Sequence, residues 1–214
     1  MRKGSLLREL PILVILALLV SLLIKSFLVQ FFYIPSGSME NTLQIKDRVA
    51  VNRVPFIGNN ISRGDVVVFR DPAGWLPEAS SVSGNRVTNA IREGLVLVGV
   101  IPNPAKQYLV KRVIGVAGDN VVGKDGIVTI NGKETDEPYI FAGNKPSELD
   151  FNVTVPEGKI WVMGDHRGAS ADSRYHQDDV NNGFVPESKV TGRVVGIIWP
   201  LKNLSTVPSQ DPLK

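Results

Sequence analysis

A serine in a tight polar turn is the first residue of this chain whose setting suits covalent chemistry. Ser38 lies in the segment 34–39, which reads IPSGSM. Proline stiffens the backbone and glycine allows a close approach, so the segment predicts a rigid turn that presents Ser38. A serine hydroxyl attacks a carbonyl only when a nearby base removes its proton. By itself the segment is equally typical of a polar linker, so its interpretation depends on the base.

The usual base of a serine hydrolase is histidine, and this chain has two. His166 and His176 both lie in polar stretches typical of exposed loops. A desolvated lysine is the alternative base. Lys111 and Arg112 lie in the apolar run 108–115, so one of these cations is expected to point inward from a strand. Only lysine loses its charge on burial, which favours Lys111 as base and Arg112 as structural cation, although a lone lysine in a strand is often a solvated edge residue.

A third polar cluster occupies residues 164–174, which read GDHRGASADSR. It follows an apolar stretch and is dense in charged and small residues. One interpretation is an exposed loop of mixed charge. The other is a hydrogen-bonded shelf beside the reactive serine. In that case Ser170 would orient the lysine ammonium, and Asp172 would pair with Arg174 or Arg112.

The element that would hold Ser38 in place is the hydrophobic segment 11–32. As a helix it would extend roughly 33 Å, which matches a bilayer core of about 30 Å. Lys25 interrupts it near its end, where a lysine can reach the headgroups. Three basic residues precede the segment, namely Arg2, Lys3 and Arg8.

The positive-inside rule then places residues 1–10 in the cytoplasm and the remainder outside. A cleaved signal peptide is the alternative, but bulky residues stand where a small-residue cleavage motif would follow. We therefore expect an uncleaved single-pass anchor in the plasma membrane. Ser38 would lie within about 20 Å of the end of the span, even with the chain fully extended.

Short apolar runs bounded by turn residues follow the anchor and predict strands. The expected strands are Arg48–Val54, Asp65–Arg70, Tyr108–Ala117, Gly126–Ile130, Lys159–Met163 and Arg193–Trp199. Asn131 and Gly132 form a strong hairpin-turn signal. The pattern predicts a mainly β catalytic domain over residues 33–199, with antiparallel sheets arranged as a coiled barrel or sandwich.

Two stretches depart from the strand pattern. Residues 72–107 begin with a loop rich in proline, glycine and serine, contain a short predicted helix at 85–100, and are interpreted as an insertion. Residues 200–214 hold three prolines and few apolar residues, so a flexible tail is expected.

Composition excludes several kinds of site. The 214 residues include no cysteine, so disulfides, zinc–thiolate sites and a cysteine nucleophile are ruled out. The zinc-hydrolase motif HExxH does not occur, and no metal or other cofactor is expected. The net charge of +3 comes without a dense run of lysine and arginine, which argues against a nucleic-acid partner.

Taken in order, these motifs resemble the bacterial type I signal peptidases. The matching stretches are the N-terminal span, 35–39 (PSGSM), 63–69 (RGDVVVF), 111–115 (KRVIG) with Gly118-Asp119, and 164–174. The resemblance runs to about Trp199, apart from residues 72–107. It implies a Ser/Lys dyad, with Ser38 as nucleophile and Lys111 as general base.

The same resemblance implies supporting roles. The Ser36 hydroxyl would join the Ser38 amide in an oxyanion hole, and Ser170 would position the lysine. Asp172 and Arg174 would form a supporting ion pair. Residues near the dyad in sequence are candidate walls for the substrate pocket, namely Ile34, Pro35, Met39 and Val110. Three positions depart from the usual family pattern: Asn41 stands where proline is common, and Gly168 and Ala169 stand where Asp-Asn is common.

The function implied is removal of signal peptides from exported precursors, with small side chains before the cleaved bond, at the outer membrane surface. Membrane lipid and the secretion translocon would be partners. One alternative is another Ser/Lys protease, such as a self-cleaving repressor-type domain, although the anchor and the missing helix-turn-helix argue against it. The second alternative is a catalytically silent membrane-anchored binding module, against which the presence of both Ser38 and Lys111 argues.

Overall fold

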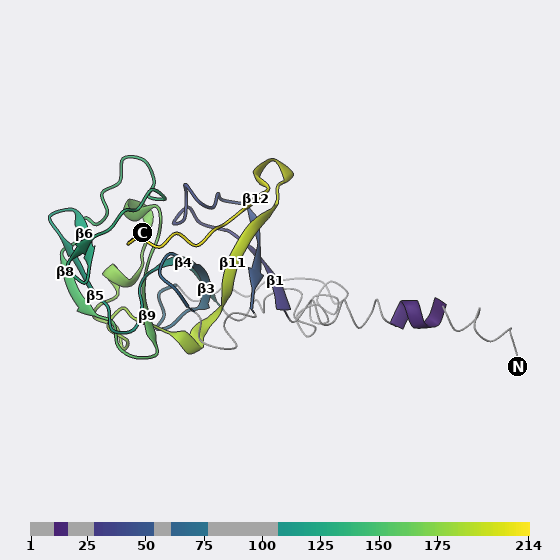
Figure 1. Cartoon of the computed structure of the whole chain (residues 1–214), viewed down its shortest axis with the longest axis horizontal. Coiled ribbons are helices and arrows are strands. Elements are labelled where there is room, and N and C mark those ends of the chain that lie inside the picture. Colours follow the sequence, from purple (N-terminus) through teal and green to yellow (C-terminus); the bar gives the residue numbers. More distant parts are fainter. Residues whose placement is uncertain (1–10, 17–27, 54–60, 77–106) are drawn as a thin grey trace, which may run out of the picture.

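Two antiparallel β-sheets form the body of the protein (Figure 1). The computed structural model describes residues 11–16, 28–53, 61–76 and 107–214. The larger sheet has the order β1-β2-β11-β3-β4-β9-β10, with β12 beside β11. Its strands are β1 (Val29–Tyr33), β2 (Arg48–Asn52), β3 (Val66–Arg70), β4 (Tyr108–Gly115), β9 (Lys159–Met163), β10 (Val185–Pro186), β11 (Val190–Trp199) and β12 (Ser205–Thr206).

The smaller sheet has the order β7-β6-β5-β8. Its strands are β5 (Asn120–Lys124), β6 (Ile127–Ile130), β7 (Lys133–Glu134) and β8 (Phe151–Thr154). Among the described residues, four 3₁₀ turns connect strands, namely η2 (Arg167–Ala169), η3 (Ser173–Tyr175), η4 (Glu187–Lys189) and η5 (Leu201–Asn203). Figure 1 shows the small sheet at one side of the molecule and β1 at the other.

The expectation of a mainly β fold with antiparallel sheets is confirmed. Each of the six predicted strands coincides with an observed strand. The predicted hairpin turn joins β6 to β7, and its two residues take the positive φ values that such a turn needs, 53° at Asn131 and 79° at Gly132. The strand order of the larger sheet is an open path from β1 to β10 over the described residues, so it does not form the closed barrel that was one of the expected arrangements.

The end of the predicted membrane helix is wrong. The helix was expected to reach Phe32, but Val29–Tyr33 is a strand paired with β2. Its burial alternates, with Gln30 and Phe32 buried and Phe31 and Tyr33 exposed, because one face covers the core. Residues 11–16 are helical, and residues 17–27 lie outside the described part. Within the described residues, no helix has the length and apolar character needed to cross a membrane.

Strand β4 runs through the middle of the core. Leu109 and Val113 pack with β3 and β9 in one apolar cluster. Ile114 belongs to a second cluster beneath the small sheet, and Val110 borders a third cluster beneath β1 and β2. Apolar side chains therefore cover both faces of the strand that carries Lys111, and this coverage determines the electrostatics of the site.

The C-terminal segment is docked, in contrast to the flexible tail expected for residues 200–214. After β12 the side chain of Val207 is buried, and Leu213 packs against the cluster beneath the small sheet. The backbone of Asp136 donates to Pro212 O over 2.9 Å. The predicted insertion at 72–107 is described only at its two ends, and the helix expected at 85–100 lies outside the described residues.

Candidate active site

The structure brings the two predicted reactive residues into direct contact. Lys111 Nζ donates to Ser38 Oγ over 2.6 Å, although 73 positions separate them in the chain. Ser38 lies in a compact turn after β1, where Glu40 N donates to Gly37 O and Leu43 N donates to Met39 O. Lys111 comes from the centre of β4, and both side chains are buried.

The environment of Lys111 favours its neutral form. Burial lowers the pKa of Lys111 from its ordinary 10.5 to about 8, and the carboxylates of Asp172 and Asp165 partly oppose that shift. A lysine with such a pKa is partly neutral close to neutral pH, whereas an exposed lysine is almost entirely charged. A neutral amine beside a hydroxyl can accept its proton, which is the first requirement of a Ser/Lys dyad.

Gly164 lies between Ser38 and Ser170. A side chain at Gly164 would place its Cβ 2.4 Å from Ser38 O and 2.2 Å from Ser170 Oγ, so only glycine fits there. His166 N donates to Ser38 O over 3.2 Å. Ser170 Oγ is buried and has no hydrogen-bond partner among the described residues, so the expected bond from Ser170 to the lysine is not present.

Asp172 pairs with Arg174, which is one of the two partners that the sequence left open. Arg174 Nε donates to Asp172 Oδ1 over 2.9 Å, and both side chains are fully buried. Asp172 also accepts from the backbone N–H of Gly164 over 2.9 Å. The ion pair therefore anchors the strand end that carries the glycine beside Ser38.

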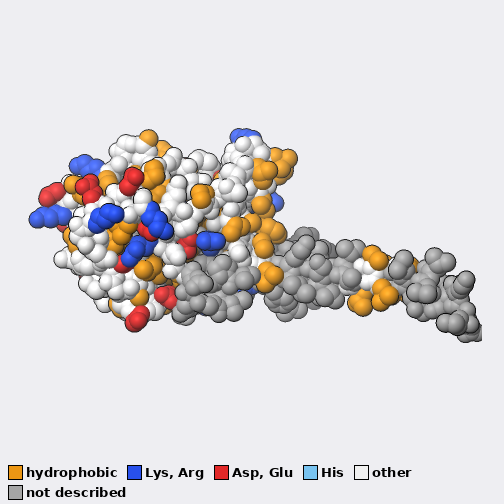
Figure 2. Space-filling view, viewed as in Figure 1, with side chains coloured by type: hydrophobic (Ala, Val, Ile, Leu, Met, Phe, Trp, Pro, Cys, Tyr) orange, Lys and Arg blue, Asp and Glu red, His pale blue; other side chains and the backbone are white. Residues whose placement is uncertain are grey.

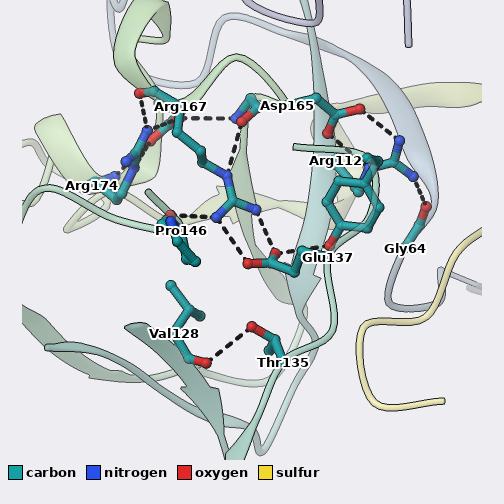
Figure 3. A network of polar contacts seen from close by, with 12 residues as sticks. Gly64, Arg112, Val128, Thr135, Glu137, Pro146, Asp165, Arg167 and Arg174 are labelled. Carbon is teal, nitrogen blue, oxygen red and sulfur yellow. Dashed lines mark hydrogen bonds and ion pairs between the residues drawn. The ribbon is translucent and has the colours of Figure 1, made fainter. Parts of the chain in front are cut away.

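Arg112 pairs instead with Asp165, a contact that the sequence did not predict. Its Nε and Nη2 donate to the two carboxylate oxygens over 2.8 and 2.6 Å, and Nη1 donates to Gly64 O over 2.8 Å. Figure 3 shows Arg112 bonded to both Asp165 and Gly64. The ring of Tyr139 lies 3.9 Å from the guanidinium carbon. One inward cation was expected on β4, but Lys111 and Arg112 are both buried because the strand is covered on both faces.

Comparison with known proteins shows the family of this chain. The family model described as signal peptidase, peptidase S26 matches residues 7–199. This chain belongs to that family. A probable signal peptidase I of Mycobacterium leprae is 36% identical over 227 residues, which cover 93% of this chain and 78% of the relative. The signal peptidase I of Mycobacterium tuberculosis is 35% identical, covering 98% of this chain and 78% of the relative.

A solved structure was also matched, that of a signal peptidase I from Enterococcus faecalis. It is 25% identical, covers 63% of this chain and 97% of its own, and has a TM-score of 0.40. Family membership and the relatives at 35–36% identity identify the chain as a serine peptidase.

The residues expected to line a substrate pocket in this peptidase have different exposures. Ile34 and Met39 are almost fully buried in the cluster beneath β1 and β2. Val110 is half-buried at the border of that cluster, and Pro35 is exposed. Ser36, the expected oxyanion residue, is also exposed. Pro35, Ser36 and Val110 are thus the accessible members of the expected set.

Neither histidine ring bonds to the reactive serine within the described residues. The ring of His166 contacts Glu40 Oε2 at 3.1 Å and stacks on Phe141. The ring of His176 stacks on Trp75 and contacts a backbone oxygen at 2.8 Å. Both rings are partly buried, unlike the exposed loop positions that their neighbours suggested. Of the candidate bases considered, only Lys111 contacts the Ser38 hydroxyl within the described residues.

Proposed function

We propose that this chain removes N-terminal signal peptides from exported precursor proteins, with Ser38 as nucleophile and Lys111 as general base. The observation that carries the proposal is the 2.6 Å contact between Ser38 Oγ and Lys111 Nζ in a buried site. The lowered pKa of Lys111 supports it, because a base must be neutral to accept a proton. The substrate class follows from the names of the relatives.

In the proposed mechanism, neutral Lys111 accepts the Ser38 proton as Oγ attacks the carbonyl before the cleaved bond. The Ser38 amide and the Ser36 hydroxyl stabilise the oxyanion, and loss of one such donor typically lowers the rate by about 10²–10³. Lys111 then gives its proton to the leaving amine, so that an acyl-enzyme forms. Water activated by Lys111 releases the signal peptide and restores Ser38.

Small side chains before the cleaved bond suit the surface beside the dyad. Pro35 and Val110 flank Ser38 and Lys111 along the chain and are accessible or half-buried. Ile34 and Met39 are packed into the core and would support that surface from beneath. The small residue preferred before the cleavage site would rest on this shallow apolar surface, which leaves little room for a large side chain.

The proposed working place is the outer surface of the plasma membrane, after a single N-terminal span. Large apolar side chains are exposed on β1 and around the end of β11, and Figure 2 shows hydrophobic side chains gathered over this region. They are Leu28, Phe31, Tyr33, Ile198, Trp199, Leu201 and Leu204. Tyr33 and Trp199 each pair with Arg48, so two aromatic residues and a cation stand in one row across three strands. Aromatic and basic residues are favoured where protein meets lipid headgroups.

The deciding experiment combines the full-length protein in detergent micelles with a secretory precursor and follows the shorter product. Wild type and Ser209→Ala, an exposed serine control, should process the precursor, whereas Ser38→Ala and Lys111→Arg should not. Arginine keeps its charge when buried and cannot serve as base. Processing by Ser38→Ala would reject the nucleophile, and no processing by wild type would favour a silent binding module.

A second experiment tests the membrane surface. The part of the chain from residue 28 onward would be incubated with vesicles that contain anionic lipid, and binding measured by sedimentation. Replacing Trp199, Leu201 and Leu204 together by serine should weaken that binding. Equal binding by the variant would exclude the apolar surface as the lipid contact.

A further inference from the structure

Asn41 has an unusual backbone conformation close to the reactive serine. Its φ is 89°, in the left-handed region that asparagine tolerates better than most residues. Its side-chain amide donates to Tyr139 O over 3.1 Å and to Ile140 O over 3.4 Å. These acceptors lie nearly one hundred positions along the chain, so Asn41 ties the serine turn to a distant segment. Proline, the residue common here in the family that the chain resembles, requires a φ near −65° and has no amide to donate.

The two neighbours of Asn41 make contacts of the same kind. Glu40 Oε2 lies 3.1 Å from His166 Nδ1. Thr42 Oγ1 donates to the carboxylate of Asp165. Three consecutive side chains therefore leave the serine turn and reach two segments, residues 139–141 and residues 164–167.

The two receiving segments are themselves joined. Phe141 N donates to Asp165 O over 2.9 Å, and the rings of Phe141 and His166 stack with centroids 4.1 Å apart. Glu137 lies just before the first segment, and its carboxylate pairs with Arg167 of the second segment at 2.5 Å (Figure 3). The turn is thus held against a surface that is already cross-linked by backbone, aromatic and ionic contacts.

The position of Ser38 depends on this arrangement more than that of Lys111 does. Lys111 is placed by β4, which is paired on both sides in the middle of the large sheet. Ser38 lies outside the strands, and its carbonyl accepts from His166 N, within the segment that receives Glu40. A catalytic contact must be held to within about 0.5 Å, so a serine in a turn requires support from outside that turn.

We propose that Glu40, Asn41 and Thr42 are positioning residues that clamp the serine turn at the distance its base requires. This inference rests on the proposed function and deepens it. Asn41 is the central member, since it alone supplies both the left-handed backbone and two side-chain bonds. The clamp acts on the geometry of the reaction and touches neither substrate nor the reacting atoms.

The experiment compares Asn41→Ala, which loses both features, with Asn41→Gly, which keeps only the ease of positive φ. The matched control is Asn131, whose φ is 53° and whose amide donates to Asp119 Oδ1 over 2.9 Å in the small sheet. Asn131→Ala removes the same two features away from the dyad. Each full-length variant is assayed in micelles for kcat and KM with a precursor-derived peptide, and thermal unfolding is recorded.

We expect Asn41→Ala to lower kcat by about 10- to 100-fold with KM nearly unchanged, because a misplacement of about 1 Å can cost about 100-fold. Asn41→Gly should recover part of that loss. Asn131→Ala should lower the unfolding temperature by a similar amount and leave kcat as in wild type. Wild-type kcat in Asn41→Ala, or an equal fall in kcat in Asn131→Ala, would overturn the clamp.

A second measurement separates this inference from the proposed function. A small fluorophosphonate phosphonylates an activated serine with loss of fluoride and without any peptide, and intact mass gives the rate for each variant. If wild type is labelled but cuts no precursor, the proposed substrate is wrong. The labelling rates of the variants then still test whether the clamp positions Ser38. Slow labelling of Asn41→Ala supports it, and equal labelling overturns it. If wild type is not labelled, Ser38 is not activated and both proposals fail.

Discussion

Activity of this peptidase should depend steeply on pH, because the proposed mechanism requires the neutral form of Lys111. With a pKa of about 8, the neutral fraction is about 1% at pH 6, about 9% at pH 7 and about 90% at pH 9. We therefore expect kcat/KM to rise about tenfold per pH unit below pH 7.5 and to level off above pH 9. If Lys111 had the ordinary lysine pKa of 10.5, kcat/KM would still rise steeply above pH 9.

The assay uses full-length protein in micelles and an internally quenched peptide without titratable side chains, so that substrate ionisation contributes nothing. Initial rates are measured from pH 5.5 to 9.5, and circular dichroism at each pH confirms that the protein remains folded. Lys111→Arg serves as the matched variant and should be inactive across the range, because its guanidinium stays protonated.

Two results would refute the reasoning. A rate that is flat from pH 6 to pH 9 would mean that no group with a pKa near 8 limits the reaction. An apparent pKa near 6.5 that disappears in His166→Gln would assign the base to histidine. Intermediate values would be resolved by Asp172→Asn. Loss of that carboxylate removes a charge that raises the pKa of Lys111, so the acidic limb should move to lower pH.

Three further predictions concern stability and geometry. Gly164→Ala should lower kcat about 100-fold, because its Cβ would displace Ser38 O, whereas Gly168→Ala, with no neighbour closer than 3.7 Å, should behave as wild type. Lys111→Met should raise the free energy of unfolding by about 3 kcal/mol at pH 7. The pKa of Lys111 is about 2.5 units below its ordinary value, and each unit corresponds to about 1.36 kcal/mol. The folded state binds fewer protons than the unfolded state between pH 8 and 10.5, so this gain should disappear across that window; a gain constant with pH would contradict it. Asp165→Asn should cost about 3–5 kcal/mol in urea unfolding by leaving a buried arginine unpaired, and equality with Asp211→Asn, whose partner is exposed, would refute this.

The parts of the fold that follow from local signals could be predicted from the sequence. The strand around Lys111 is apolar on both sides of Lys111 and Arg112, and the Asn131-Gly132 turn needs only two adjacent residues that tolerate positive φ. The start of the domain was misjudged because the apolar character resumes after Lys25 and continues into Val29–Tyr33, where pairing with β2 outweighs helical continuity. Strand β5 was missed because its run, NVVGK, is short and polar at both ends.

The site divides along the same line. Ser38 and Lys111 could be proposed because each carries a chemical signature in its own neighbourhood, a rigid turn and an inward lysine. Their contact was implied only by the family resemblance, since the local sequence does not show how β4 passes the turn after β1. The same limit applies to the ion pairs. The sequence shows two arginines and two aspartates, but the fold decides which aspartate each arginine contacts. Asp165 follows the end of β9, which pairs with β4, and it accepts from Arg112, while Asp172 caps η3 and accepts from Arg174.

Asn41 shows why the supporting contacts are the hardest to derive from sequence. Its amide donates to carbonyls on the loop between β7 and β8 of the small sheet, and any residue can supply a carbonyl, so the acceptors carry no sequence signature. Only the donor, Asn41, is specific to its residue type. The sequence shows that Asn41 replaces proline, but it does not show which contacts the asparagine makes. The role of Glu40, Asn41 and Thr42 is visible only in the fold, where their side chains contact residues 139–141 and 164–167. The precision of a dyad on a turn is therefore a property of the long-range contacts around it, which is why the clamp must be tested by kcat as well as by stability.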